Sequence, residues 1–163
     1  KMKAVQVIPN KIFTLTSIIL QLNRWRLLGK KIVFTNGVFD ILHQGHIASL
    51  SEAASYGHIL IVGVNADASV KRLKGETRPI NSEQSRALLI ASLVMIDAVL
   101  IFEEDTPLHL ITNILPDVLV KGGDYTLEQI VGAKEVIANG GEVKIAPIVE
   151  GFSTTRIIEK MRK

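Results

Sequence analysis

The feature that most constrains this sequence is a regular alternation between short apolar runs and amphipathic patterns. Short runs rich in β-branched residues are typical of strands buried on both faces of a parallel sheet. Five such strands are predicted, at 32–37, 58–67, 97–102, 117–123 and 142–149. Strands that alternate with helices are joined by right-handed crossovers. The sequence therefore predicts an α/β fold with a Rossmann-like, doubly wound sheet of parallel strands.

Helix signals occupy the intervals between these strands. Capping residues, proline and glycine predict helices that end at Gly57, begin at Asn81, begin at Thr106, and span 126–139 and 153–162. One interval is different, because the segment KRLKGETRP at 71–79 is dominated by basic residues. We expect this segment to be a mobile cationic loop after the second strand.

Length and composition fit one compact domain. The chain has 163 residues, of which 47% are hydrophobic, and we expect a single domain over 1–163, with 1–29 as an N-terminal extension whose helix packs on it. No apolar run reaches the ~18 residues that cross a bilayer, so we expect no membrane association and a cytoplasmic location. The net charge of +3 is not gathered into one stripe, which argues against a nucleic-acid partner. A mild positive charge suits a small anionic ligand.

Two of the four histidines, His43 and His46, lie at the junction between the first strand and its helix, around Gly45. In open α/β sheets, ligands bind beyond the carboxyl ends of the strands. The start of a helix attracts phosphate through its free N–H groups and its dipole. The spacing of the histidines lets both rings face one small volume and donate hydrogen bonds there. The junction therefore predicts a phosphate-binding site.

Two other interpretations of the histidine pair stay open. The rings can be ordinary surface or core residues without a ligand. They can also bind zinc, but the chain has no cysteine and zinc needs a third ligand, for which Asp40 is the nearest candidate. The dinucleotide fingerprint GxGxxG and the P-loop GxxxxGK[ST] are both absent from the sequence. Hydride-transfer and P-loop kinase chemistry therefore lose support.

Several segments together resemble a known family. GVFDILHQGH at 37–46 resembles the GxFDxxHxGH signature of the cytidylyltransferase-like nucleotidyltransferases, and GFSTTRII at 151–158 resembles their C-terminal ISTT loop. RPIN at 78–81, FEEDTP at 102–107 and LVKGGDY at 119–125 are similar to one branch, the adenylyltransferase domain of ADP-heptose synthases. The resemblance implies the nucleotidyltransferase version of the predicted fold. It also implies transfer of AMP from ATP to D-glycero-β-D-manno-heptose 1-phosphate, giving ADP-heptose and pyrophosphate for lipopolysaccharide core synthesis.

The resemblance also implies cofactors and partners. Mg²⁺ is expected to be bound mainly through the phosphates of ATP, with no dedicated protein metal site. A sugar kinase, fused or separate, and a second copy of the chain in a homodimer are the expected partners. Two alternatives stay open: a cytidylyltransferase that acts on glycerol 3-phosphate or a related polyol phosphate, and a non-catalytic nucleotide-binding module.

Catalysis of such a transfer requires positioning and charge stabilisation rather than a strong base. His43 and His46 are the predicted transition-state donors. Lys74 is the third catalytic candidate, because the phosphate-binding lysine of the family lies next to a glycine; a solvated surface lysine is the alternative. Arg78 and Arg86 are candidates for the sugar phosphate, although an ion pair within the protein is equally compatible with Arg86.

The predicted nucleotide-binding residues share positions at strand ends or helix starts. They are Thr35, Asn36, Gly37, Phe39, Asp40 and Gly45 around the first turn, Lys121, Gly122 and Asp124 after the fourth strand, and Ser153, Thr154 and Thr155 at the start of the last helix. We expect the adenine to lie on the glycines and Asp124 to meet the ribose or a base edge. An ordinary turn, an ordinary helix cap and a turn-fixing role for Asp40 are the alternatives.

Overall fold

The computed structural model describes residues 5–123, 125–147 and 154–161 of the chain. Its centre is a five-stranded, all-parallel sheet in the order β3-β2-β1-β4-β5. The strands are β1 (Ile32–Gly37), β2 (Ile59–Asn65), β3 (Ala98–Phe102), β4 (Val118–Gly122) and β5 (Glu142–Ala146). The order reverses beside β1, which pairs with β2 on one edge and β4 on the other. The predicted fold class is confirmed.

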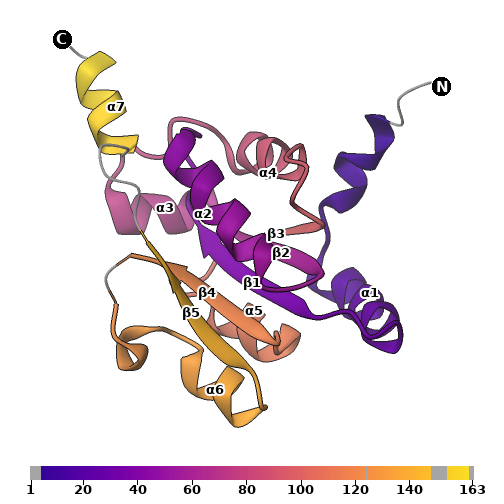
Figure 1. Cartoon of the computed structure of the whole chain (residues 1–163). Coiled ribbons are helices and arrows are strands. Elements are labelled where there is room, and N and C mark those ends of the chain that lie inside the picture. Colours follow the sequence, from indigo (N-terminus) through magenta and orange to yellow (C-terminus); the bar gives the residue numbers. More distant parts are fainter. Residues whose placement is uncertain (1–4, 124, 148–153, 162–163) are drawn as a thin grey trace.

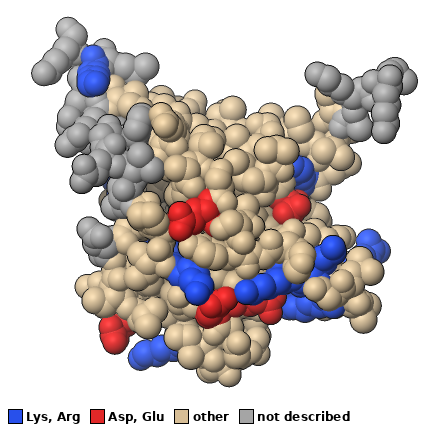
Figure 2. Space-filling view, in the orientation of Figure 1, with Lys and Arg blue, Asp and Glu red and all other residues tan. Residues whose placement is uncertain are grey.

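Helices cover both faces of the sheet (Figure 1). They are α1 (Leu15–Leu27), α2 (Gln44–Ser55), α3 (Asp67–Lys74), α4 (Glu83–Ala91), α5 (Leu108–Ile114), α6 (Ala133–Ala138) and α7 (Thr154–Met161), with short 3₁₀ turns η1 (Val5–Val7), η2 (Pro9–Lys11) and η3 (Leu127–Gln129). None of these described helices is long and apolar enough to cross a membrane. Figure 2 shows acidic and basic side chains intermixed on one face of the molecule.

Alternate strand residues build two hydrophobic clusters, one on each face. Phe34 and Ile61 point into the cluster that α1, α5 and α6 cover. Val33 and Val62 point into the cluster that α2 and α4 cover. This period of two, on strands with both faces buried, explains why the runs are continuously apolar. The two clusters fix the strand ends from which the turns of the site emerge.

The N-terminal segment is tied to the domain at two places. Ile18 and Leu22 of α1 are buried in the cluster with α5. Ahead of that helix, the Phe13 N–H donates to the Val99 carbonyl oxygen at 2.8 Å, along the outer edge of β3. The sheet edge at β3 is thereby partly covered by the chain's own N-terminal segment.

The prediction of a loop at 71–79 is wrong in part. Lys71, Arg72 and Lys74 belong to α3, which begins at Asp67 and buries Val70 completely. An acidic residue in the first turn and basic residues in the last turn favour this helix through its dipole. The run of charged residues concealed this helix, because among its apolar residues only Val70 is fully buried. Only the part of the segment from Gly75 onward lies outside a helix, and the second strand ends at Asn65 rather than at 67.

The predicted helix 126–139 is also divided in two. Gly132 has a φ of +84° and separates η3 from α6. A Cβ on Gly132 would lie 2.7 Å from side-chain carbons of Ile111. The glycine therefore serves both a left-handed backbone and a close approach to α5, two demands that no periodicity reveals.

Candidate functional site

A crevice opens at the carboxyl ends of β1 and β4, where the strand order reverses. It consists of two adjoining cavities, of about 410 Å³ and about 210 Å³. They share a wall made by Asn36, Gly37, Val38 and Lys121. This is the position at which open α/β sheets bind their ligands.

Most of the predicted first-turn residues line this crevice. Thr35, Asn36, Gly37, Phe39, Lys121 and Gly122 line one or both cavities, and His46 lines the smaller one. Lys74, the last residue of α3, lines the larger one. The structure thus places the first strand, the fourth strand and the basic end of α3 around one space.

The two histidines lie together at the start of α2. His43 is the residue that precedes the helix, and His46 is its third residue. Their rings are stacked, with centroids 3.8 Å apart and planes 24° from parallel. The Phe39 ring meets His46 edge-on at 5.3 Å. Among the described residues, the buried Nδ1 of His46 has no hydrogen-bond partner, so this atom is available to a ligand.

Burial disfavours the charged form of both rings. It lowers the pKa of His43, and burial together with the charge of His43 lowers the pKa of His46 to about 4. A neutral imidazole still has one N–H to donate. A bound phosphate would favour the charged ring, because an opposite charge nearby raises the pKa of a histidine.

Acidification is expected to destabilise the fold through His46. A histidine in the unfolded chain titrates near 6.5, whereas folded His46 titrates at about 4. The unfolded state therefore binds more protons between these pH values. The contribution of the neutral His46 ring to the free energy of unfolding is complete above pH 6.5 and is lost as the pH falls towards 4. At pH 5 these two values correspond to a loss of about 2 kcal/mol, which solvent screening of the partly exposed ring reduces to about 1 kcal/mol. Urea denaturation at pH 7 and pH 5 should show a smaller loss for His46→Gln than for wild type; equal losses would refute the effect.

The turn after β1 depends on a close approach between Gly37 and Phe39. Phe39 has a φ of +50°, and its ring is folded back against β1. A Cβ on Gly37 would lie 2.9 Å from two carbons of that ring. The glycine thus makes room for the ring that in turn contacts His46.

Replacing Gly37 with alanine is expected to lower the free energy of unfolding by about 1–3 kcal/mol, since the ring must move. Gly122→Ala is the matched control, because a Cβ there meets nothing within 4 Å. Thermal denaturation of the two variants would test this. A Gly37→Ala protein as stable as the Gly122→Ala protein would show that the turn absorbs the methyl group freely.

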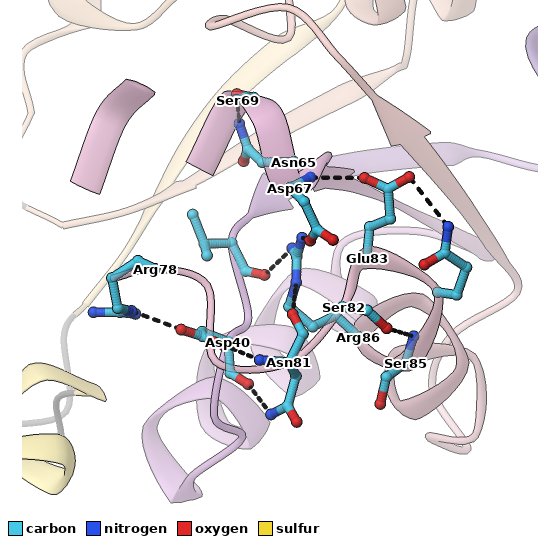
Figure 3. A network of polar contacts seen from close by, with 12 residues as sticks. Asp40, Asn65, Asp67, Ser69, Arg78, Asn81, Ser82, Glu83, Ser85 and Arg86 are labelled. Carbon is cyan, nitrogen blue, oxygen red and sulfur yellow. Dashed lines mark hydrogen bonds and ion pairs between the residues drawn. The ribbon is translucent and has the colours of Figure 1, made fainter. Parts of the chain in front are cut away.

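Asp40 is held by a set of hydrogen bonds from the segment before α4 (Figure 3). Its carboxylate accepts from the Ile80 N–H at 2.8 Å, the Asn81 N–H at 3.0 Å and Arg78 Nε at 2.6 Å. Burial alone would raise the pKa of Asp40, but the hydrogen bonds from Asn81, Ile80 and Arg78 hold it below its usual value. These contacts favour the turn-fixing role and leave Asp40 poorly placed to bind zinc. The described residues contain no group of three His, Asp or Glu that could hold a metal.

Arg86 lies at the centre of the same network and is completely buried. Its guanidinium donates to the Val38 carbonyl at 2.8 Å, to the Asn81 carbonyl at 3.0 Å and to Asp67 Oδ1 at 2.7 Å (Figure 3). One side chain therefore connects the turn after β1, the segment before α4 and the start of α3. This geometry favours the ion-pair interpretation of Arg86 over direct contact with a substrate.

Other predicted residues are placed less directly. Thr154 Oγ1 lies 3.4 Å from the Ile41 carbonyl oxygen, which brings the start of α7 to the histidine turn. Gly45 is the second residue of α2. Arg78 is paired with Asp40 and only 14% of its side chain is exposed. Asp124, Ser153 and the side chain of Thr155 lie outside the described residues.

Sequence reasoning missed several residues of the crevice. Asn65 ends β2, Thr106 follows β3, and Ser49 lies one turn beyond His46; all three line a cavity. Tyr125 belongs to the motif at 119–125 and had no predicted role, yet it lines the larger cavity and its ring lies 5.6 Å from Lys121 Nζ. Applying the carboxyl-end rule to β2 and β3 as well as β1 and β4 would have found Asn65 and Thr106.

A switch-point crevice with a histidine pair at the adjoining helix start defines a nucleotide-binding α/β protein. The chain belongs to the cytidylyltransferase-like family, whose signature matches residues 34–160. The bifunctional protein HldE of Koribacter versatilis (strain Ellin345) is 52% identical over 158 residues, which are 97% of this chain and 32% of that protein. The chain thus spans about a third of the length of this curated relative.

Solved structures agree with this assignment. The lipopolysaccharide core biosynthesis protein of Thermoplasma volcanium GSS1 is 34% identical, with a TM-score of 0.59 over 74% of this chain and 98% of that one. Pantothenate synthetase of Thermus thermophilus has a TM-score of 0.60 over 90% of this chain and 67% of that one. At 17% identity, the second likeness supports the fold alone. The family resemblance inferred from the motifs is therefore confirmed.

Proposed function

We propose that the chain is an adenylyltransferase that transfers AMP from ATP to D-glycero-β-D-manno-heptose 1-phosphate. The products are ADP-heptose and pyrophosphate, and the pathway is lipopolysaccharide core synthesis. The observation that carries the proposal is the stacked pair His43 and His46 at the start of α2, beside the switch-point crevice. The similarity to HldE and to a lipopolysaccharide core biosynthesis protein supports the choice of sugar.

In the proposed reaction, a phosphate oxygen of the sugar attacks the α-phosphorus of ATP in line. A new O–P bond forms, the bond to the bridging oxygen of the β-phosphate breaks, and its electron pair leaves with pyrophosphate. The nucleophile is already an anion, so no strong base is needed. His43 and His46 donate hydrogen bonds to the charge that develops on the leaving group, and the start of α2 adds its dipole.

The cavities suggest how the two substrates are divided. We assign the phosphates of ATP to the smaller cavity, which His46 and Gly122 line, and the sugar phosphate to the larger one, which Lys74 lines. Lys74 is exposed at the end of α3, so it can close over the phosphates without first breaking a buried contact. Because the described residues offer no metal cluster, we propose that Mg²⁺ enters with ATP, coordinated by phosphate oxygens.

Partners and setting follow from the same proposal. Residues 1–163 form one nucleotidyltransferase domain, working in the cytoplasm, where its nucleotide is available. A sugar kinase, fused or separate, supplies the heptose 1-phosphate, which agrees with the bifunctional name and greater length of HldE. The proposal of a homodimer is based on the family resemblance, and light scattering of the purified chain measures the oligomeric state.

Pyrophosphate release with matched pairs of substrates tests this function. ATP and CTP are each combined with D-glycero-β-D-manno-heptose 1-phosphate and with glycerol 3-phosphate. We expect release with ATP and the heptose phosphate only. Consumption of CTP with glycerol 3-phosphate would favour the cytidylyltransferase alternative, and binding of ATP without any turnover would favour the non-catalytic module.

A further inference from the structure

Among the described residues, Lys121 is the charged residue that lines both cavities of the crevice. Four residues form the wall between the two cavities, and Lys121 is the charged one among Asn36, Gly37, Val38 and itself. It is the fourth residue of β4, at the strand end where the sheet order reverses. Its side chain is thus within reach of both cavities at the point where they meet.

The surroundings of Lys121 leave its charge available to a ligand. Three arginines near the crevice have acidic partners: Arg72 pairs with Asp105, Arg78 with Asp40 and Arg86 with Asp67. Among the described residues, Lys121 has no such ion pair, and its Nζ lies 5.6 Å from the centroid of the Tyr125 ring. Burial lowers the pKa of Lys121, because desolvation disfavours the charged ammonium. The face of the tyrosine ring partly offsets that desolvation.

The chemistry of the proposed function explains why a cation belongs at this wall. Two anions must approach each other until an oxygen of one contacts the phosphorus of the other. Their repulsion is strongest at the reacting atoms, where water is largely displaced. A cation on the side of one substrate would improve the binding of that substrate only. A cation at the boundary offsets the repulsion between both.

We propose that Lys121 contacts the α-phosphate of the nucleotide and the phosphate of the acceptor together, and so makes their simultaneous binding possible. This inference rests on the proposed function and adds a catalytic residue to it. The lysine keeps its proton throughout. The bonds formed and broken are those at the α-phosphorus, and the electron pair still leaves with pyrophosphate.

The distinctive consequence is a coupling between the two ligands. The dissociation constant of the heptose phosphate is measured by calorimetry with and without saturating α,β-methylene-ATP, which cannot be cleaved at the reacting bond. The ratio of the two constants reports how well both anions are accommodated together. In Lys121→Met we expect this ratio to become at least tenfold less favourable than in wild type, whereas Lys121→Arg should retain most of the wild-type coupling.

A second lysine provides the control. Lys134→Met removes an exposed charge on α6, away from both cavities, and should leave the ratio unchanged. If Lys121→Met weakens one ligand only and the ratio stays at the wild-type value, the lysine belongs to a single subsite and the inference is overturned. The inference is also overturned if Lys121→Met weakens the binding of both ligands and the ratio stays at the wild-type value. Wild-type turnover, measured first, separates this outcome from a failure of the proposed function, because the coupling can be measured with whichever nucleotide and acceptor the wild type uses.

The rate of reaction gives an independent readout. With both substrates saturating, we expect Lys121→Met to lower kcat about a hundredfold, since its charge faces the reacting atoms. Lys121→Arg should recover part of that loss. A Lys121→Met enzyme with wild-type kcat and a raised KM for one substrate would contradict contact with both phosphates.

Discussion

Replacing His46 with alanine is expected to lower kcat about a hundredfold while the protein stays folded. The ring lines the smaller cavity at the start of α2, and its Nδ1 has no hydrogen-bond partner among the described residues. Its loss removes a donor already aimed at the developing charge, which typically costs ~3 kcal/mol of transition-state stabilisation. His43→Ala should have an effect of similar size. The two losses should not simply add, because stacked rings act as a unit.

The control for both variants is His109→Ala, which removes an exposed histidine on α5. Rates of pyrophosphate release are compared at saturating substrate, with circular dichroism to confirm folding. The binding of ATP should change much less than kcat, because the donors act mainly in the transition state. Turnover at the wild-type rate in both His43→Ala and His46→Ala would remove the histidines from the mechanism.

Replacing Arg86 with methionine is expected to produce the largest loss of stability, about 3 kcal/mol. Methionine replaces the aliphatic stem of arginine, but it donates no hydrogen bond. The carbonyl oxygens of Val38 and Asn81 lose their partner inside the protein, and the Asp67 carboxylate loses its ion pair. Breaking a buried pair by removing one partner typically costs about 3–5 kcal/mol. We place the loss at the lower end because the side chain of Asp67 is 36% exposed.

Two further variants serve as comparisons for Arg86→Met. Arg86→Lys keeps the charge but cannot reach three acceptors in a fork, so an intermediate loss is expected. Arg24→Met removes an exposed arginine from α1 and should change the free energy of unfolding by less than about 0.5 kcal/mol. Urea denaturation measures all three. An Arg86→Met protein as stable as Arg24→Met would mean that the network of Figure 3 contributes little to holding the turn.

The sequence predicts the fold well because the signal is repeated. The central strands bury both faces and are largely apolar, whereas the edge strand β5 is only half-buried and includes Glu142 and Lys144. Five strand signals that alternate with helices leave few possible topologies. Errors occur where one local feature dominates a segment. Charge on 71–74 concealed α3, and helical periodicity around Gly132 concealed a left-handed residue. Both depend on contacts with distant elements, which a pattern along the chain does not contain.

The same distinction between local and distant contacts applies to the residues of the candidate site. The placement of His43 and His46 together at the start of α2 could be predicted, because strand end, glycine turn and helix start are all local in sequence. Arg86 could not be placed, because its acceptors belong to residues 38, 67 and 81, which only the folded chain brings together. The shared wall at Lys121 likewise exists only once β1 and β4 are neighbours. Sequence therefore indicates candidate residues for the chemistry, and the structure indicates which residues hold them in place.

The most direct test of the account is product analysis with ATP and D-glycero-β-D-manno-heptose 1-phosphate, comparing wild type with the His43→Ala, His46→Ala double variant. The account predicts that wild type forms ADP-heptose and pyrophosphate in equal amounts, and that the double variant forms them at least a hundredfold more slowly although it still binds ATP. Equal rates in the two proteins, or no ADP-heptose from wild type, would contradict it.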